Sequence, residues 1–406
     1  MWQGLFVLTV RCCGMALNPI SQPEVLLPDV ADLTRWSVIA CDQFTAQPEY
    51  WEKLTTMVGA APSSLRFILP EVWLEELLDS APAEIGAAMH AALEAGQFRQ
   101  HHGYVLVERT LPSGVKRLGM MANLALEDYD YTPQNNARIK ATEATVPDRL
   151  PPRAAIRQAA PLEMPHVLVL LNDPEHQIIE TLYDRRDEFE LLYDFELNMG
   201  GGHIRGWLIP DQFGALTADF IGLERDGLLA VIGDGNHSLA AAKLTGDTNA
   251  LVELVNIHSP AIEFEPIHRV VIGAGQEFID TLAGAVSGPV TTNVYHNGTT
   301  YQINVSENPA DAIADVQRFI DNYVIDNSAD SNAIVIDYIH GDKELISIAD
   351  KLAAEGKEAV AIFLPAIDKN TLFDYTSRRG VLPRKAFSIG HAEDKRYYLE
   401  LAFRSV

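Results

Sequence analysis

Short apolar runs of strand length alternate along this chain with longer segments in which apolar residues recur at helical spacing. Apolar runs of about four to eight residues between polar turns are typical of buried strands, whereas a period near 3.6 is typical of packed helices. The predicted strands cover residues 36–41, 104–109, 115–127, 167–171, 189–197, 229–233, 250–257, 265–272, 301–305, 333–339, 359–364 and 396–403. The predicted helices begin at Pro48 and Pro70 or cover residues 83–95, 173–186, 238–246, 277–285, 309–323, 343–354 and 368–379. This alternation predicts an α/β to α+β fold built on a mixed sheet.

The order of these elements predicts two domains. Residues 15–260 hold the mixed sheet, and residues 261–406, in which helix and strand alternate from about residue 273, form a second α+β domain. Residues 1–14 carry a short apolar run that is followed, rather than preceded, by Arg11, unlike a signal peptide. We expect these residues to be a non-native or disordered extension, with translation starting at Met15.

The charge of the chain limits its partners. The sequence has 56 acidic and 31 basic residues, which gives a formal net charge of −25. This field repels nucleic acids and anionic membranes, so neither is an expected partner, and an anionic substrate needs a local basic pocket. Three cysteines cannot form a disulfide framework, and no apolar run has the length of a membrane span. We therefore predict a reducing, cytoplasmic location.

The turn between the apolar run 229–233 and the alanine-rich helix after it concentrates polar chemistry. A strand-turn-helix directs backbone N–H groups and the positive end of a helix dipole at whatever lies above the turn. Gly233 and Gly235 permit a positive φ and the close approach of a ligand to the backbone. A carboxylate, an amide, an imidazole and a hydroxyl share the same few positions, at Asp234, Asn236, His237 and Ser238.

Helix capping is the alternative interpretation of this turn. Asn236 or Ser238 would then cap the helix, with Asp234 assisting. Capping accounts for one polar residue better than for four, so we favour an anion-binding active centre.

A second candidate segment, residues 138–157, is rich in cations in a chain that is otherwise poor in them. Cations that hold a phosphorylated ligand, together with a carboxylate for proton transfer or a metal, would have this composition. A helix with alternating surface charges is the alternative, and the local sequence alone slightly favours it. The charged residues are Arg138, Lys140, Glu143, Asp148, Arg149, Arg153 and Arg157.

Two further segments carry weaker indications. Asp42 follows the strand 36–41, and α/β proteins place ligands beyond the carboxyl ends of strands, but a helix cap or Asx-turn explains it equally well. Three glycines at 200–202 precede His203 and Arg205, which could wrap an anion or form a flexible hairpin tip. The spacing matches neither a Walker A motif nor a dinucleotide fingerprint.

With these segments in view, the chain resembles the bacterial and archaeal family called domain of unknown function 1015. The resemblance extends from about Pro19 to Phe403 and rests on several motifs that occur in order. These are Trp36-Ser-Val-Ile-Ala-Cys-Asp-Gln-Phe-Thr45, Ala141-Thr-Glu-Ala-Thr145 with Asp148-Arg149, Asp234-Gly-Asn-His237, Pro266-Ile-His-Arg269, Gly380-Val-Leu-Pro-Arg-Lys385 and Lys395-Arg-Tyr-Tyr398.

The resemblance implies that the Asp-Gly-x-His turn is the phosphate-binding box of the ParB/sulfiredoxin-like fold, which includes kinases that phosphorylate free L-serine with ADP or ATP. The family's usual box is Asp-Gly-His-His-Arg. Here Asn236 replaces the first histidine and Ser238 stands at the arginine position, which removes a bidentate phosphate clamp. Arg205, Lys140 and Arg269 are the candidates to replace that cation.

The function that this resemblance implies is a small-molecule kinase acting on a hydroxylated metabolite such as free L-serine. Residues 235–238 would hold the phosphates of ATP or ADP, and Glu143 would be the base. Asp234 would hold Mg²⁺, and His237 would be a further catalytic residue. Arg138, Lys140 and Arg149 would surround the transferred group. Substrate contacts would come from Asp42, His268, Arg269, Arg384 and Lys385, although a strand-end structural role also explains His268. A nucleotide- or metabolite-binding regulator without turnover is the alternative, and the oligomeric state stays open.

Overall fold

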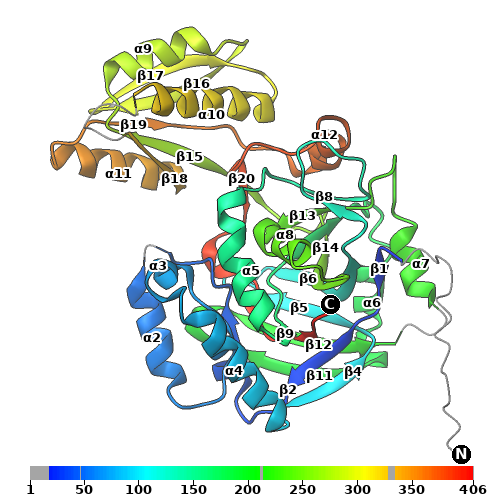
Figure 1. Cartoon of the computed structure of the whole chain (residues 1–406). Coiled ribbons are helices and arrows are strands. Elements are labelled where there is room, and N and C mark those ends of the chain that lie inside the picture. The colour runs from blue at the N-terminus through cyan, green and yellow to red at the C-terminus, as the bar shows by residue number, and fades with distance from the viewer. Residues whose placement is uncertain (1–17, 46, 211–213, 328–333, 406) are drawn as a thin grey trace, which may run out of the picture.

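The computed structural model describes residues 18–45, 47–210, 214–327 and 334–405, so the predicted extension 1–14 lies outside the described residues. Two sheets, a larger mixed one and a smaller antiparallel one, organise this part of the chain (Figure 1). The larger sheet has the order β11 (Glu190–Glu196), β12 (His203–Ile209), β5 (Tyr104–Thr110), β6 (Lys116–Ala125), β14 (Asn249–Asn256), β10 (Leu168–Leu171), β13 (Ala230–Asp234), β8 (Ile139–Ala141) and β7 (Tyr129–Asp130), with β1 (Ile20–Ser21) on β6. The mixed α/β class is thus confirmed.

The smaller sheet has the order β17 (Thr299–Val305), β16 (Val290–His296), β19 (Ala359–Ile362), β15 (Phe264–Ile272) and β18 (Val335–His340), with β20 (Phe387–Ile389) on β15. Its alternating side chains serve two cores, because successive strand residues point to opposite faces. Val270 packs with Leu345 of α11 (Asp342–Ala354), while Val271 packs with Phe278 of α9 (Gln276–Ala285) and Val316 of α10 (Pro309–Asp326). The sheet therefore lies between two helical layers (Figure 1).

Helices of the first part of the chain surround the larger sheet. Contacts between α4 (Ala81–Glu94) and α5 (Leu150–Ala159) and between α5 and α8 (Asn236–Leu244) place these three helices side by side. No helix in the described ranges is long and apolar enough to cross a membrane. The remaining helices are α1 (Leu33–Trp36), α2 (Pro48–Val58), α3 (Leu74–Leu77), α4 (Ala81–Glu94), α5 (Leu150–Ala159), α6 (Ile179–Asp184), α7 (Ala215–Ile221), α8 (Asn236–Leu244) and α12 (Leu372–Arg379).

The C-terminal segment returns from the smaller sheet to the first part of the chain. In β21 (Tyr397–Tyr398) the residue Tyr397 pairs with Ile39 of β3 (Val38–Ile39). The last strand, β22 (Ala402–Phe403), pairs with β9 (Leu162–Glu163), and Leu401 bridges to Leu26 of β2 (Glu24–Pro28), the partner of β4 (Phe98–His102). The strand predicted at 396–403 is therefore split in two and pairs outside the second predicted domain.

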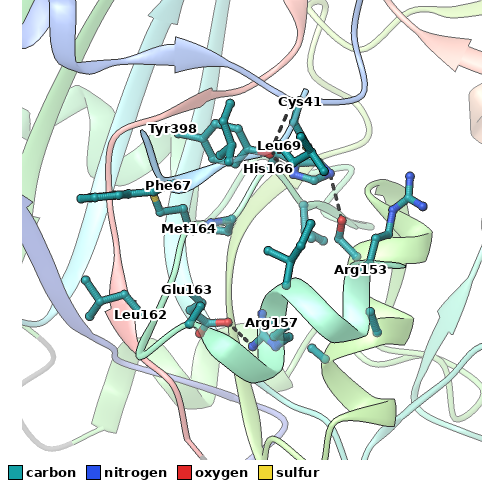
Figure 2. Close-up of a pocket in the computed structure, with 18 of the residues that line it drawn as sticks. Cys41, Phe67, Leu69, Arg153, Arg157, Leu162, Glu163, Met164, His166 and Tyr398 are labelled. Carbon is teal, nitrogen blue, oxygen red and sulfur yellow. Dashed lines mark hydrogen bonds and ion pairs between the residues drawn. The ribbon is translucent and has the colours of Figure 1, made fainter. Parts of the chain in front are cut away.

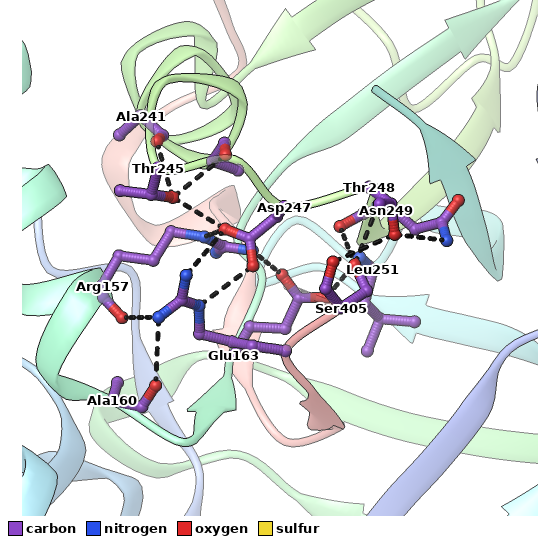
Figure 3. A network of polar contacts seen from close by, with 12 residues as sticks. Arg157, Ala160, Glu163, Ala241, Thr245, Asp247, Thr248, Asn249, Leu251 and Ser405 are labelled. Carbon is purple, nitrogen blue, oxygen red and sulfur yellow. Dashed lines mark hydrogen bonds and ion pairs between the residues drawn. The ribbon is translucent and has the colours of Figure 1, made fainter. Parts of the chain in front are cut away.

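A buried ion network fixes this returning segment (Figure 3). The Arg157 guanidinium contacts Glu163 and lies 2.7 Å from Asp247, and Asp247 also accepts from Arg404 at 3.0 Å. Ser405 accepts from the backbone N–H of Thr248. Because each buried charge has an opposite partner, the cost of desolvating it is offset. Arg157, a cation of the 138–157 segment, is thus structural.

Several elements differ from their prediction. The helix predicted at 173–186 is limited to α6, because the Asp173 carboxylate accepts from the N–H groups of Gln177 and Ile178 and holds a turn there. Trp36 ends α1 instead of starting a strand. The threonine-rich strand β16 was not predicted. The predicted strand 333–339 begins at a residue outside the described ranges.

Candidate functional site

The polar turn joins β13 directly to α8, and the helix begins at Asn236, two residues earlier than predicted. Gly235 has a φ of +80°, and a Cβ there would lie 2.9 Å from Val167. A Cβ on Gly233 would lie 2.8 Å from Leu170 and from Ile389. Both glycines are thus required by backbone conformation and packing within the protein, whether or not a ligand is bound.

The amino end of α8 has no side-chain cap. Gly235 occupies the N-cap position, and the Leu239 N–H, bonded to the Gly235 carbonyl, is the first amide in the helical ladder. By helix geometry the three preceding amides, of residues 236–238, have no partner within the helix. The capping interpretation is therefore wrong, and the helix presents donors and the positive end of its dipole at this turn.

Asp234 is held by an ion pair with the returning C-terminal segment. One carboxylate oxygen accepts from the Gly235 N–H at 2.9 Å, and the other lies 3.1 Å from the ammonium of Lys395. Lys395 is buried and also donates to Ser388 at 3.3 Å. Lys395 was not among the predicted site residues, although the motif 395–398 contributed to the family resemblance.

His237 is an uncharged imidazole surrounded by cations. Burial, together with Arg153, Arg149 and Lys385, lowers its pKa to about 4, against an opposing effect of Asp42. Its Nε2 accepts the Val146 N–H at 3.1 Å, so the proton of the neutral ring is on Nδ1. At neutral pH His237 is a hydrogen-bond donor rather than a cation.

Asp42 lies within the same electrostatic environment. Burial opposes its ionisation, but His166, the hydrogen bond from Gln43 and the charges of Lys395 and Lys385 lower its pKa below the usual value. The Gln43 amide donates to Asp42 at 2.9 Å. Asp42 is therefore an ionised carboxylate near the turn, as expected for a residue beyond the end of a strand.

Glu143 follows β8 and holds the segment that carries Lys385. Its two oxygens accept the N–H groups of Lys385 and Ala386, each at 3.0 Å. Burial raises its pKa, and Lys385 and these amides oppose the rise. The Thr142 carbonyl accepts the Leu382 N–H, which adds a short ladder beside the carboxylate. Glu143 thus positions Lys385, which itself has a φ of +55°.

Two buried polar atoms near the turn lack partners among the described residues, namely Asn236 Oδ1 and Thr145 Oγ1. The amide nitrogen of Asn236 lies 3.4 Å from Thr142 Oγ1, a long contact. Buried acceptors of this kind are ordinarily satisfied by water or a ligand. The turn therefore offers unsatisfied acceptors as well as helix amides.

The structure does not bring Arg138 to this site. Arg138 pairs with Glu224 at 2.6 Å and with Asp128 at 3.7 Å, and its carbonyl accepts from Leu229 at the start of β13. Arg138 precedes β8 and Glu143 lies beyond its other end, next to the turn. The ion pairs of Arg138 lie at the end of β8 opposite to Glu143, so these contacts give no support to the prediction that both residues flank one ligand.

Neither Lys140 nor Arg205 replaces the cation missing at Ser238. Lys140 is buried in the middle of β8, opposite Val231, and takes no part in the contacts described at the turn. Arg205, on β12, pairs with Asp194 at 3.1 Å.

Two predicted substrate residues are fixed inside the protein. Arg269 is fully buried and donates to Gln317 at 2.7 Å and to the Lys385 carbonyl at 3.0 Å, so it supports the Lys385 segment. His268 accepts the Leu364 N–H and lies 2.8 Å from Asp342, which agrees with its structural interpretation.

Arg384 also makes its contacts away from the turn. Its guanidinium is 3.3 Å from Asp321 and 5.6 Å from the centre of the Tyr338 ring. Its neighbour Lys385, by contrast, does affect the turn residues, because its positive charge helps to lower the pKa of His237 and of Asp42.

A pocket of about 150 Å³, partly open to solvent, lies beside α8 (Figure 2). Its polar end carries a chain of hydrogen bonds. His166 Nε2 is 3.1 Å from Ser238 Oγ, its Nδ1 is 2.8 Å from the Tyr398 hydroxyl, and that hydroxyl is 3.2 Å from Cys41 Sγ. Burial raises the pKa of the Cys41 thiol to about 11, so it stays protonated. No motif in the sequence indicated His166.

The chain belongs to the family described as protein of unknown function (DUF1015), whose model matches residues 26–323. No curated protein matches it. A free serine kinase variant in complex with ADP has 12% identity and a TM-score of 0.40, over 71% of this chain and 94% of that chain. A conserved hypothetical protein from Pyrococcus furiosus has 12% identity and a TM-score of 0.38, over 69% of this chain and 90% of that chain. SbnI with a C-terminal truncation, from Staphylococcus aureus, has 10% identity and a TM-score of 0.36, over 66% of this chain and 82% of that chain. Family membership rests on the sequence match.

Proposed function

We propose that this protein is a phosphotransferase that moves a phosphoryl group from ATP or ADP to the hydroxyl of a small metabolite. The observation that carries the proposal is the uncapped amino end of α8, next to Lys395 and within the field of Arg149, Arg153 and Lys385. In a chain of net charge −25, cations gathered at one turn favour a polyanionic ligand. The resemblance to the ParB/sulfiredoxin-like box and to free L-serine kinases is consistent with this ligand.

Phosphate oxygens would bind the amides of residues 236–238 and the neutral Nδ1–H of His237. Helix amides and aligned dipoles suit anions without adding a mobile side chain. Lys385, Lys395 and Arg149 would supply the positive charge that is missing at Ser238. They would take the role first assigned to Arg205, Lys140 and Arg269.

Mg²⁺ would enter with the nucleotide. No group of three or more histidine, cysteine, aspartate or glutamate side chains suitable for a metal occurs within the described ranges. Mg²⁺ is ordinarily held by one or two carboxylates plus phosphates and water, so this arrangement fits a nucleotide-borne ion. The Asp234 carboxylate is engaged by Lys395 and Gly235, so the phosphates and water would supply most of the Mg²⁺ ligands.

For the chemical step, the acceptor oxygen bonds to the transferred phosphorus while the bond from that phosphorus to the donor's bridging oxygen breaks. ATP then leaves as ADP, or ADP as AMP, and the acceptor proton passes to Asp42. Phosphoryl transfer needs mainly positioning and charge neutralisation. Glu143, first expected to be the base, instead holds Lys385 in place through its three backbone partners.

An assay with ATP and with ADP across hydroxylated metabolites, free L-serine included, tests this proposal. We expect phosphorylated product by mass spectrometry from the wild type and none from Asp42→Asn. Nucleotide that neither raises the melting temperature nor is consumed would overturn the proposal.

A nucleotide-binding regulator is a second candidate. It is favoured by the engagement of the Asp234 and Glu143 carboxylates in protein contacts, which suits a binding site better than a proton-transfer site. Stabilisation by nucleotide without any product would identify this function.

A further inference from the structure

We infer that the pocket beside α8 binds the uncharged, apolar body of the phosphoryl acceptor, which makes the acceptor an alcohol with an apolar group rather than a free amino acid. The identification of the ligand as an acceptor rests on the proposed function. The apolar character of what the pocket binds rests on its lining alone.

The size and lining of the pocket favour an apolar occupant. Most of its walls are aliphatic or aromatic, including Phe67, Leu69, Met89, Ile156, Leu162 and Met164. Its cavity volume is about 150 Å³, the size of an engineered apolar cavity that stays dry and binds benzene. Apolar walls hold water and a zwitterion poorly, so such a cavity suits an apolar group better than free serine.

The charged residues of the lining are already paired within the protein. Glu163 contacts Arg157 and accepts the Leu251 N–H at 2.8 Å, and Arg157 also lies 2.7 Å from Asp247. Glu71 contacts Arg153 at the opposite wall. An amino acid bound here would bring an ammonium and a carboxylate, and burying either without a partner is costly. The lining therefore selects against a zwitterion.

The polar end of the pocket suits a hydroxyl. His166 and Ser238 offer hydrogen-bonding groups 3.1 Å apart, and Tyr398 fixes the imidazole from its other nitrogen. Ser238 belongs both to this lining and to the first turn of α8, where the phosphates are proposed to bind. Asp42 follows Cys41, another lining residue, so the proposed base is next to this end. An alcohol anchored here would present its oxygen to the donor.

Titration calorimetry with 1-decanol, L-serine and adenosine as probes tests the inference. We expect 1-decanol to bind and L-serine not to bind. Met164→Trp and Ile156→Phe enlarge side chains of the lining and should each weaken decanol binding at least tenfold, while Met57→Trp, on α2 and outside the lining, leaves it unchanged. The second filling variant serves if the first does not fold.

Three results would overturn the inference. These are no binding of decanol to the wild type, unchanged decanol affinity in both filling variants, or displacement of decanol by adenosine, which would assign the pocket to the nucleobase. Decanol binding that the filling variants abolish, in a protein that neither binds nor consumes nucleotide, would instead retain the apolar site and remove the proposed phosphotransferase function.

Discussion

The ammonium of Lys395 lies 3.1 Å from the carboxylate of Asp234, so a residue of the returning C-terminal segment completes the turn between β13 and α8. Lys395→Met removes one partner of this largely buried pair and leaves the other charge without compensation. We expect the free energy of unfolding to fall by about 1–3 kcal/mol. Urea unfolding measures the change.

The matched control for that variant is Lys357→Met, because Lys357 pairs with Glu355 on the surface at 2.9 Å. Exposed pairs contribute about 0–1 kcal/mol. Equal losses of unfolding free energy in the two variants would show that the Lys395–Asp234 contact stabilises the protein no more than an exposed ion pair does.

Asp42 is the proposed base, so Asp42→Asn should lower the rate of phosphoryl transfer by about 100-fold or more while nucleotide affinity changes little. Initial rates with saturating ATP measure the effect. Asp337→Asn, at an exposed position, is the control and should retain full activity. An active Asp42→Asn enzyme would exclude this residue as the base.

Arg149 is exposed and acts on His237 through its charge. Arg149→Ala should weaken nucleotide binding about tenfold, as expected for the loss of one charge-assisted hydrogen bond, and leave the melting temperature unchanged. The difference should shrink at high salt, because exposed charges are screened. Arg205→Ala, which removes a cation remote from the turn, should not alter nucleotide affinity.

The lowered pKa of His237 makes the stability of the protein depend on pH. Its pKa of about 4 in the folded protein is below the value of 6.5 expected for the unfolded chain, so the unfolded state binds more protons between these values. Stability from this group is fully present above about pH 6.5 and is lost as the pH falls towards 4. Thermal melts of His237→Gln should therefore show a weaker pH dependence in this window than the wild type.

His90→Gln is the control for the pH series, because His90 is exposed on α4. It should follow the wild-type curve. If His237→Gln and His90→Gln behave alike, the imidazole of His237 is not kept neutral by the fold.

Local features of the fold were predictable where one segment contains the whole signal. The apolar run before Gly233 and the alanines after Ser238 predicted the strand, turn and helix that the structure contains, with the helix start displaced by two residues. The threonine-rich strand β16 was missed, because its exposed face gives it little apolar periodicity.

The site itself could be predicted only in part. Asp42 and His237 stood out because they follow apolar runs in polar turns. Arg138 was grouped with Glu143 because the two are close in sequence, but they lie beyond opposite ends of β8, and Arg138 is paired with Glu224. His166 and Lys395 are remote in sequence from the turn that they contact, so no local pattern could reveal them.

By itself the sequence determined the alternation of strands and helices, the acidic field of the chain and the polar turn at residues 233–238. The tertiary structure alone decided which charges reach that turn. Pairing of β21 with β3 brings Lys395 back to Asp234, and the salt bridges of Arg138 and Arg205 hold those cations elsewhere. The physical reason is that periodicity records how a segment packs locally, whereas the position of a charge depends on contacts between segments far apart in the chain.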